Sequence, residues 1–311
     1  MIVEPLRGIM SKTTEVQTAM RNAAQHKSRL MIIASMVIFG TLGPFVRNIP
    51  IPSAALALCR AVMAVALLGL YFLISGQRID FRAIRKELPL LLISGMAIGV
   101  NWILLFEAYR YTTVSVATLS YYFAPVLVTI ACPLLFHEKM GLKQWICFAM
   151  STLGIVLITG IGDLSGNNRH LTGILLGLSA AVLYATAVIL NKVIKGVAGI
   201  QRTFLQFSAA IVILLPYVLC TGGVQLGLLD GSGWISLLVV GMLHTGIAYC
   251  LYFSAIKDVS GQEAAILSYI DPLVAVAVSF FVLSEQMTPT QILGGVLVLG
   301  FTLWNEMTQK K

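Results

Sequence analysis

Charged residues are scarce in this sequence. Asp, Glu, Lys and Arg make up only 11% of its 311 residues, whereas apolar residues make up 58%. An ordinary soluble domain carries about 25% charged residues, and the mean hydropathy of +0.89 is also far too high for one. This shortage of charge excludes a soluble globular protein and predicts an integral membrane protein.

Signatures of enzymes and of disulfide frameworks are missing as well. The five cysteines lie in apolar runs without C-x-x-C spacing, which predicts small buried side chains. The stretch HEKMG at 137–141 has Gly141 where a zinc protease needs its second His, and the chain has neither G-x-S-x-G nor G-x-x-x-x-G-K-[ST]. We therefore expect no catalytic residue, no metal and no cofactor, and disfavour an intramembrane enzyme or an ATP-driven pump.

Polar segments are short, and the longest is the N-terminal tail, residues 1–29. This tail has no apolar core of its own, so it is not typical of a cleavable signal peptide. The rest of the chain consists of apolar runs near the roughly 20 residues that a helix needs to cross a bilayer. Ten such spans are predicted, at 30–47, 53–75, 88–109, 113–136, 143–161, 171–191, 203–221, 234–256, 262–284 and 288–306.

Lys and Arg are distributed unevenly between the two sides of these spans. Of the 21 basic residues, 17 fall in the tail, the C-terminus and alternate loops on one side, and Arg60 lies inside a span. Cytoplasmic loops hold the excess of basic residues, so both termini are expected in the cytoplasm, with the protein in the cell membrane. The net charge of +8 is therefore a topology signal and no sign of nucleic-acid binding.

An internal repeat is the most informative feature of the chain. Residues 91–145 align without a gap to residues 238–292, with 11 of 55 positions identical. Because each repeat, 30–161 or 171–306, has five spans, the second must enter the membrane in the opposite sense. Inverted repeats of this kind are typical of secondary transporters, whose substrate site lies near the midplane between the repeats. The identities include Gly99/Gly246, Phe106/Phe253, Tyr122/Tyr269, Pro125/Pro272, Glu138/Glu285 and Gln144/Gln291.

The end of each repeat has a common pattern: a Pro, an apolar run, a Glu, and a Gln six residues after the Glu. The pattern comprises Pro125, Glu138 and Gln144 in the first repeat, and Pro272, Glu285 and Gln291 in the second. With the ten spans, it resembles the EamA-type members of the drug/metabolite transporter superfamily over essentially residues 30–306.

The resemblance implies an all-α bundle of ten helices, with a central cavity between the first four helices of each half and the fifth and tenth helices at the periphery. It also implies export from the cytoplasm more often than uptake. Members move amino acids, purines, sugars, drugs and other metabolites. We expect an amino acid or a related amphiphilic solute, and a facilitator without proton coupling remains the alternative. The oligomeric state is left open.

Two ionisable residues of the second repeat are expected near mid-membrane. Asp271 lies about nine residues, or roughly 13 Å, inside one predicted span, and His244 lies roughly 15 Å inside another. Their counterparts in the first repeat are Ala124 and Ala97, so the repeat architecture does not demand them. Intramembrane ionisable residues usually mark functional sites. One hypothesis is a polar site for a substrate amine, a coupling proton or both; the alternative is an Asp that caps a Pro-broken helix and a His that packs.

The first repeat has a different pair of charges, Arg60 and Glu107, near the outer ends of their spans. Their counterparts, Gln206 and Ser254, are neutral. The favoured interpretation is a mutual ion pair that satisfies both charges. The other interpretation assigns Arg60 to a substrate carboxylate, which its planar fork suits.

Several polar and aromatic residues complete the list of candidates for the cavity wall. The cavity candidates are Asn101, Trp102, Tyr122 and Tyr249. Buried Tyr and Trp tips usually find a hydrogen-bond partner and can hold an aromatic solute, although each such residue alone is more often part of helix packing.

Two glycines, Gly95 and Gly99, lie on one helical face and predict close helix approach.

Overall fold

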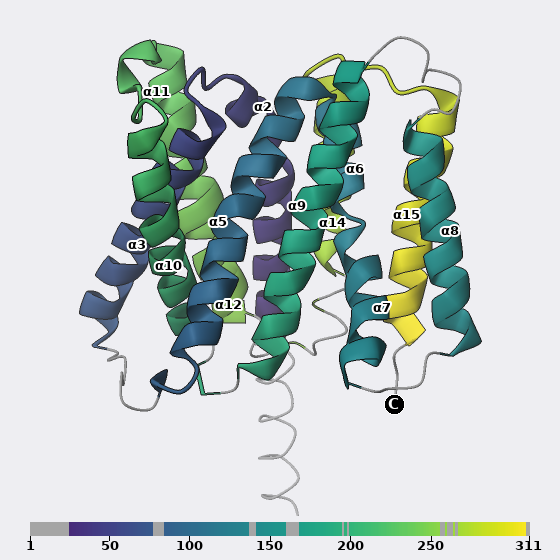
Figure 1. The fold of residues 1–311 in the computed structure, drawn as a ribbon, viewed down its shortest axis with the longest axis horizontal. Helices are drawn as coiled ribbons and strands as arrows, with labels where there is room; N and C mark the ends of the chain where they lie inside the picture. Colours follow the sequence, from purple (N-terminus) through teal and green to yellow (C-terminus); the bar gives the residue numbers. More distant parts are fainter. Residues whose placement is uncertain are drawn as a thin grey trace, which may run out of the picture.

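The computed structural model describes residues 25–76, 84–136, 141–159, 168–194, 196–197, 199–255, 259, 264 and 267–308. These residues form helices and connecting segments without a β-strand, and most helices run side by side as one bundle (Figure 1). The helices are α2 (Leu42–Arg47), α3 (Ser53–Ser75), α5 (Leu88–Tyr111), α6 (Val114–Tyr121), α7 (Ala124–Phe136), α8 (Leu142–Thr159), α9 (Asn168–Val193), α10 (Gly199–Cys220), η1 (Leu226–Leu228), α11 (Gly231–Leu238), η2 (Val239–Ile247), α12 (Ala248–Ala255), α14 (Ile270–Phe281) and α15 (Pro289–Thr308).

Seven helical segments in the described residues are long and apolar enough to cross a membrane. A helix suits such a chain because it satisfies all its backbone hydrogen bonds internally, which the hydrocarbon core requires. These segments are Gln25–Arg47, Ser53–Ser75, Leu88–Tyr111, Val114–Ala131, Arg169–Val193, Gly199–Cys220 and Gly231–Ala255. An all-helical, multi-pass membrane protein is thus confirmed, whereas the number of ten crossings and their inverted arrangement stay predictions.

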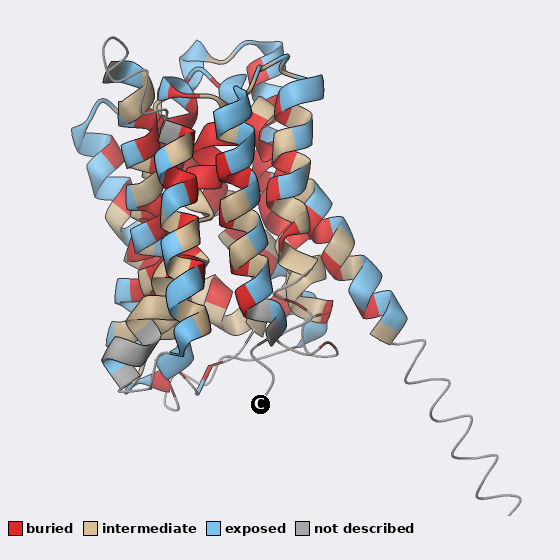
Figure 2. Cartoon of the chain, turned by 90° about the vertical axis from the view of Figure 1, so that its right-hand side faces the viewer, coloured by how far each residue is buried: buried red, intermediate tan, exposed pale blue. Residues whose placement is uncertain are grey.

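The surface of the bundle is apolar where it would meet lipid. Large side chains such as Leu73, Val212 and Phe281 are exposed, and Figure 2 shows exposed residues on the outward faces of the helices with buried residues between them. In water this distribution would be unfavourable, since it leaves large apolar area in contact with solvent. It fits a protein whose outer solvent is the bilayer.

Glycines allow two helix pairs to approach closely. A Cβ on Gly95 would lie 2.3 Å from the backbone oxygen of Gln206, and one on Gly99 would lie 3.2 Å from Ala210 Cβ, so these two glycines pack α5 against α10 as expected. At one edge of the bundle, α8 packs along α15 (Figure 1). A Cβ on Gly294 would lie 2.5 Å from the Gly154 backbone oxygen.

Two helix interruptions fall at matching positions of the repeat. The helix that ends at Tyr121 resumes at Ala124, and α14 begins directly after a turn at Tyr269. Tyr122 and Tyr269 are aligned by the sequence repeat, and their rings lie 6.5 Å apart. The prolines that follow, Pro125 and Pro272, cannot donate a backbone hydrogen bond, which explains why both helices are broken here.

Candidate substrate site

Asp271 lies in the first turn of α14, directly after the turn at Tyr269. The Tyr122 hydroxyl donates a 2.6 Å hydrogen bond to Asp271 Oδ2. The structure therefore brings together two candidates from different repeats, at the two helix interruptions. The start of a helix favours a negative charge, which supports a structural role in part. Yet the side chain is only half-buried, and Oδ1 has no hydrogen-bond partner in the described part of the chain.

Arg60 on α3 is nearly enclosed, with 3% of its surface exposed. Its Nε donates a 2.7 Å hydrogen bond to Thr245 Oγ1. Its guanidinium carbon lies 4.5 Å from the centroid of the Trp102 ring and 5.6 Å from that of Phe106. The sequence candidates Arg60 and Trp102 are therefore in contact, and the guanidinium is held by one hydroxyl and two rings.

A chain of aromatic rings connects the surroundings of these two charges. Tyr249 contacts the rings of Phe39 and Phe207 at centroid distances of 5.0 and 5.3 Å, and Phe207 lies 5.0 Å from Trp102. Tyr249 also stacks on Phe253, at a centroid distance of 5.8 Å. This candidate is therefore packed among aromatic rings, one of which contacts Trp102 beside Arg60.

The other candidate base, His244, is fully buried in the π-helical segment η2. Its Nε2 shares a 3.0 Å hydrogen bond with Thr41 Oγ1, and its Nδ1 lies 3.2 Å from Val239 O. The neighbouring residue Gly40 packs against the backbone of Asp271. The first helix thus contacts both ionisable residues, but among the described residues each has its own side-chain partners and they do not contact each other.

Two other candidates have partners away from Arg60. The expected ion pair between Arg60 and Glu107 is wrong: Glu107 accepts a 2.5 Å hydrogen bond from Ser53, at the start of α3. Similar depth on two helices does not place two side chains on facing sides, which explains the error. Asn101 donates a 2.6 Å hydrogen bond to the backbone oxygen of Ala180 and so links α5 to α9.

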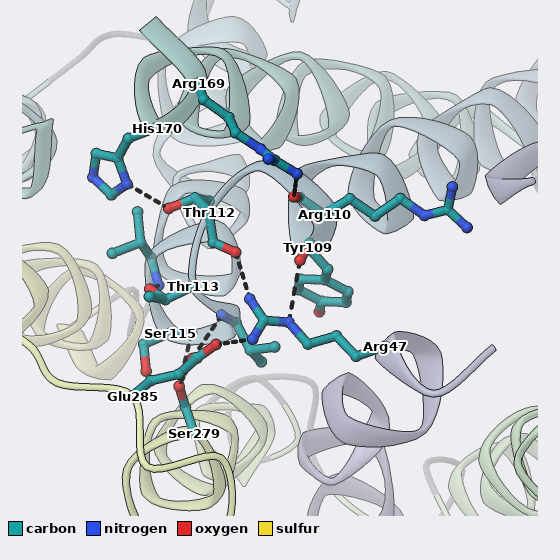
Figure 3. A network of polar contacts seen from close by, with 12 residues as sticks. Arg47, Tyr109, Arg110, Thr112, Thr113, Ser115, Arg169, His170, Ser279 and Glu285 are labelled. Atoms are coloured by element: carbon teal, nitrogen blue, oxygen red, sulfur yellow. Dashed lines mark hydrogen bonds and ion pairs between the residues drawn. The ribbon is translucent and has the colours of Figure 1, made fainter. Parts of the chain in front are cut away.

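A second polar network closes one end of the bundle, where α2, the end of α5, the start of α6 and the segment after α14 meet (Figure 3). Arg47 forms an ion pair with Glu285 and donates to the backbone oxygens of Tyr109 and Thr112 at 3.2 and 2.7 Å. Glu285 Oε2 accepts the backbone N–H of Val114 at 2.9 Å, at the start of α6. Glu285 thus caps the start of α6, while its repeat counterpart Glu138 lies outside the described residues.

The sequence is similar to that of known transporters. The profile of the EamA-like transporter family matches residues 26–160 and again residues 171–305. The chain belongs to the EamA-like transporter family. It is therefore a membrane transporter of the drug/metabolite transporter superfamily and not an enzyme.

Relatives of this EamA-like transporter include proteins from several bacteria. An uncharacterized transporter, YxxF of Bacillus subtilis (strain 168), is 31% identical over 279 residues, which cover 89% of each chain. A "Probable amino-acid metabolite efflux pump" of Salmonella typhimurium (strain LT2) is 24% identical over 246 residues, 75% of this chain and 82% of that one. One crystal structure matches with a TM-score of 0.62 at 15% identity, over 88% of this chain and 95% of the other, which supports the fold alone.

Sequence reasoning missed the polar partners of the candidate residues. Thr245 and Thr41 hold Arg60 and His244, yet single threonines in apolar runs give no signal. It also missed the π-helix of η2, in which the Thr245 hydroxyl donates to Val240 O, five residues earlier. Such π segments are frequently found at functional sites. The described residues contain no group of three His, Cys, Asp or Glu side chains that could hold a metal.

Proposed function

We propose that this protein is a secondary transporter that exports an amino acid or a related amphiphilic solute across the cell membrane by alternating access. The moving parts are two inverted five-helix repeats, residues 30–161 and 171–306, with both termini in the cytoplasm. The repeat alignment and the matching interruptions at Tyr122 and Tyr269 support this architecture. The name of the Salmonella relative supports the class of solute and the direction.

The observation that carries the proposal is a carboxylate inside the bundle that has one donor, Tyr122, among the residues the structure describes. A charged side chain at the bilayer centre costs about 2.5–3.5 kcal/mol on insertion scales. An ionised carboxylate has about four acceptor sites, and Tyr122 fills one of those on Asp271. Asp271 is thus suited to accept further hydrogen bonds from a solute ammonium group, to be protonated by a coupling proton, or to do each in turn.

The experiment is extracellular metabolite profiling of cells that overproduce the wild-type protein or Asp271→Asn. Asn keeps the shape of the side chain and removes its charge. Asp230→Asn is the matched control, because Asp230 caps α11 at one end of the bundle (Figure 1) and Asn is an equally good helix N-cap. Membrane levels of all three proteins are matched by immunoblot.

We expect one or a few solutes to accumulate outside cells with the wild-type protein and with Asp230→Asn, but not with Asp271→Asn. Equal accumulation with Asp271→Asn would remove Asp271 from the transport site. No accumulation with any protein would contradict export, and uptake would then replace it. In proteoliposomes, flux that is unchanged when the pH difference is collapsed would favour the facilitator over proton coupling.

A further inference from the structure

Arg60 has more donors than its surroundings use. Its Nε is engaged by Thr245, but neither Nη1 nor Nη2 has a hydrogen-bond partner within the part of the chain that the structure describes. Trp102 covers one face of the guanidinium at 4.5 Å. A guanidinium has five N–H donors in a fixed fork. The contacts therefore fix the plane of the fork, while the two Nη atoms keep their donors available within the described part of the chain.

The charge of Arg60 is also not balanced by a contacting acid. Among the described residues, no carboxylate lies within ion-pair distance of Arg60. Arginine stays charged in proteins, and a buried charge without its partner is costly. Since 97% of the residue's surface is covered, bulk water cannot fully compensate. An anionic group from outside the chain would complete this site.

The other repeat shows that the position itself does not require unused donors. The residue aligned with Arg60 is Gln206, which is equally buried at 3% exposure. Its Nε2 donates to Ser94 Oγ and to Asn191 Oδ1, both at 2.6 Å. The same place in the fold thus holds a neutral, satisfied amide in one repeat and an incompletely satisfied cation in the other. The difference indicates a ligand role for Arg60.

We propose that Arg60 binds a carboxylate of the transported solute through Nη1 and Nη2, so that the solute is a small zwitterion with its ammonium group toward Asp271. Two parallel N–H···O bonds match the geometry of a carboxylate. Thr245 and Trp102 position the fork. Next to Thr245, the His244 ring bonds to Thr41, and the adjacent Gly40 packs against the Asp271 backbone, so contacts link the two ends of the proposed site. This inference rests on the proposed transport function and adds the chemical class of the solute and the residue that selects it.

The test is a thermal-shift binding screen of purified wild-type protein with the 20 proteinogenic amino acids and their decarboxylated amines. Arg60→Gln is the main variant, because Gln occupies the aligned position in the other repeat. Arg60→Lys keeps the charge and loses the fork. Thr245→Val leaves Arg60 in place without its hydroxyl partner, and it serves as the test if Arg60→Gln does not fold.

We expect at least one amino acid to stabilise the wild-type protein, with its amine analogue binding about 10- to 100-fold more weakly, which corresponds to about 1.4–2.8 kcal/mol. Arg60→Gln is expected to bind the amino acid and the amine with similar affinity, because only the carboxylate contact is lost. Arg60→Lys and Thr245→Val are expected to lie between these two. A merely structural Arg60 would weaken both ligands alike.

The proposal is overturned if no amino acid stabilises the wild-type protein, if amine analogues bind as well as their amino acids, or if Arg60→Gln keeps the preference for the carboxylate. These outcomes are separable from failure of the transport function. Metabolite profiling of the wild-type protein reports on transport whatever the solute. A protein that exports a solute without a carboxylate would therefore keep its proposed function and refute only the role of Arg60.

Discussion

The ion pair between Arg47 and Glu285 is a contact whose loss should destabilise the folded protein measurably. It joins α2 of the first repeat to the segment between α14 and α15 of the second repeat (Figure 3). Glu285→Gln removes the charge but keeps an oxygen for the Val114 N–H. Glu285→Ala removes both contacts, so the two variants separate the ion pair from the helix cap.

The size of the effect follows from burial. Exposed ion pairs contribute about 0–1 kcal/mol, whereas removing one partner of a fully buried pair costs about 3–5 kcal/mol. The side chain of Glu285 is 8% exposed and that of Arg47 is 33% exposed, so this pair falls between the two cases. We expect Glu285→Gln to cost about 2 kcal/mol, and Glu285→Ala to cost about 1 kcal/mol more through the lost cap.

Thermal unfolding in mild detergent, followed with a thiol-reactive dye, measures this effect. With the exposed Cys220 replaced by Ser in all variants, the dye reports unfolding through the buried Cys147 and the half-buried Cys59 and Cys250. A loss of 2 kcal/mol corresponds to a fall in Tm of about 3 °C in a chain of 311 residues, because the entropy of unfolding is about 2.1 cal/mol/K per residue. Arg47→Met and the double variant with Glu285→Gln complete a double-mutant cycle.

The double variant should lose less than the sum of the single losses, by about 1–2 kcal/mol. Additivity to within about 0.5 kcal/mol would show that the two side chains do not interact. Such a result would refute the claim that the ion pair between Arg47 and Glu285 stabilises this end of the bundle.

Two further predictions concern helix packing. Gly294→Ala places a Cβ against the backbone of Gly154 and should cost about 1–3 kcal/mol of stability. Gly300→Ala on the same helix is the control, because its Cβ meets nothing within 4 Å, and it should be neutral or stabilising. Equal Tm values for the two variants would contradict this packing of α8 and α15. Asn101→Leu removes the donor to Ala180 O and should cost about 1 kcal/mol in the same assay. It should not change the preference of the protein for amino acids over their amine analogues. A changed preference would place Asn101 in the substrate site.

The sequence predicts those features that depend on composition and on the repeat. Scarce charge and long apolar runs are enough to predict a helical membrane protein, because the bilayer allows few alternatives. The repeat aligns Tyr122 with Tyr269, and the structure has a helix interruption at each of them; at the first, Tyr122 donates to Asp271. Within the described residues, the all-helical fold and the close packing at Gly95 and Gly99 follow from the sequence in this way.

The side-chain partners could not be predicted, because helical periodicity fixes a face only relative to its own helix. Arg60 and Glu107 lie at similar depths in their spans, yet their partners are Thr245 and Ser53. The π-helix adds a second difficulty. Thr245 bonds to a carbonyl five residues earlier, and this spacing departs from the 3.6-residue period on which the reasoning from sequence depends.

The separation of Arg60 and Asp271 is what makes a zwitterionic solute consistent with alternating access. The first repeat supplies the cation and the second supplies the anion, so a direct ion pair would hold the empty halves together. Without such a pair, each group keeps a desolvation cost that a ligand of opposite charge can offset. A bound zwitterion would neutralise both groups at once and connect the two repeats through the solute. On this mechanism, closing the bundle around Arg60 and Asp271 costs less free energy with the zwitterion bound than without it. The solute therefore favours the closed intermediate that lies between the inward-open and the outward-open states.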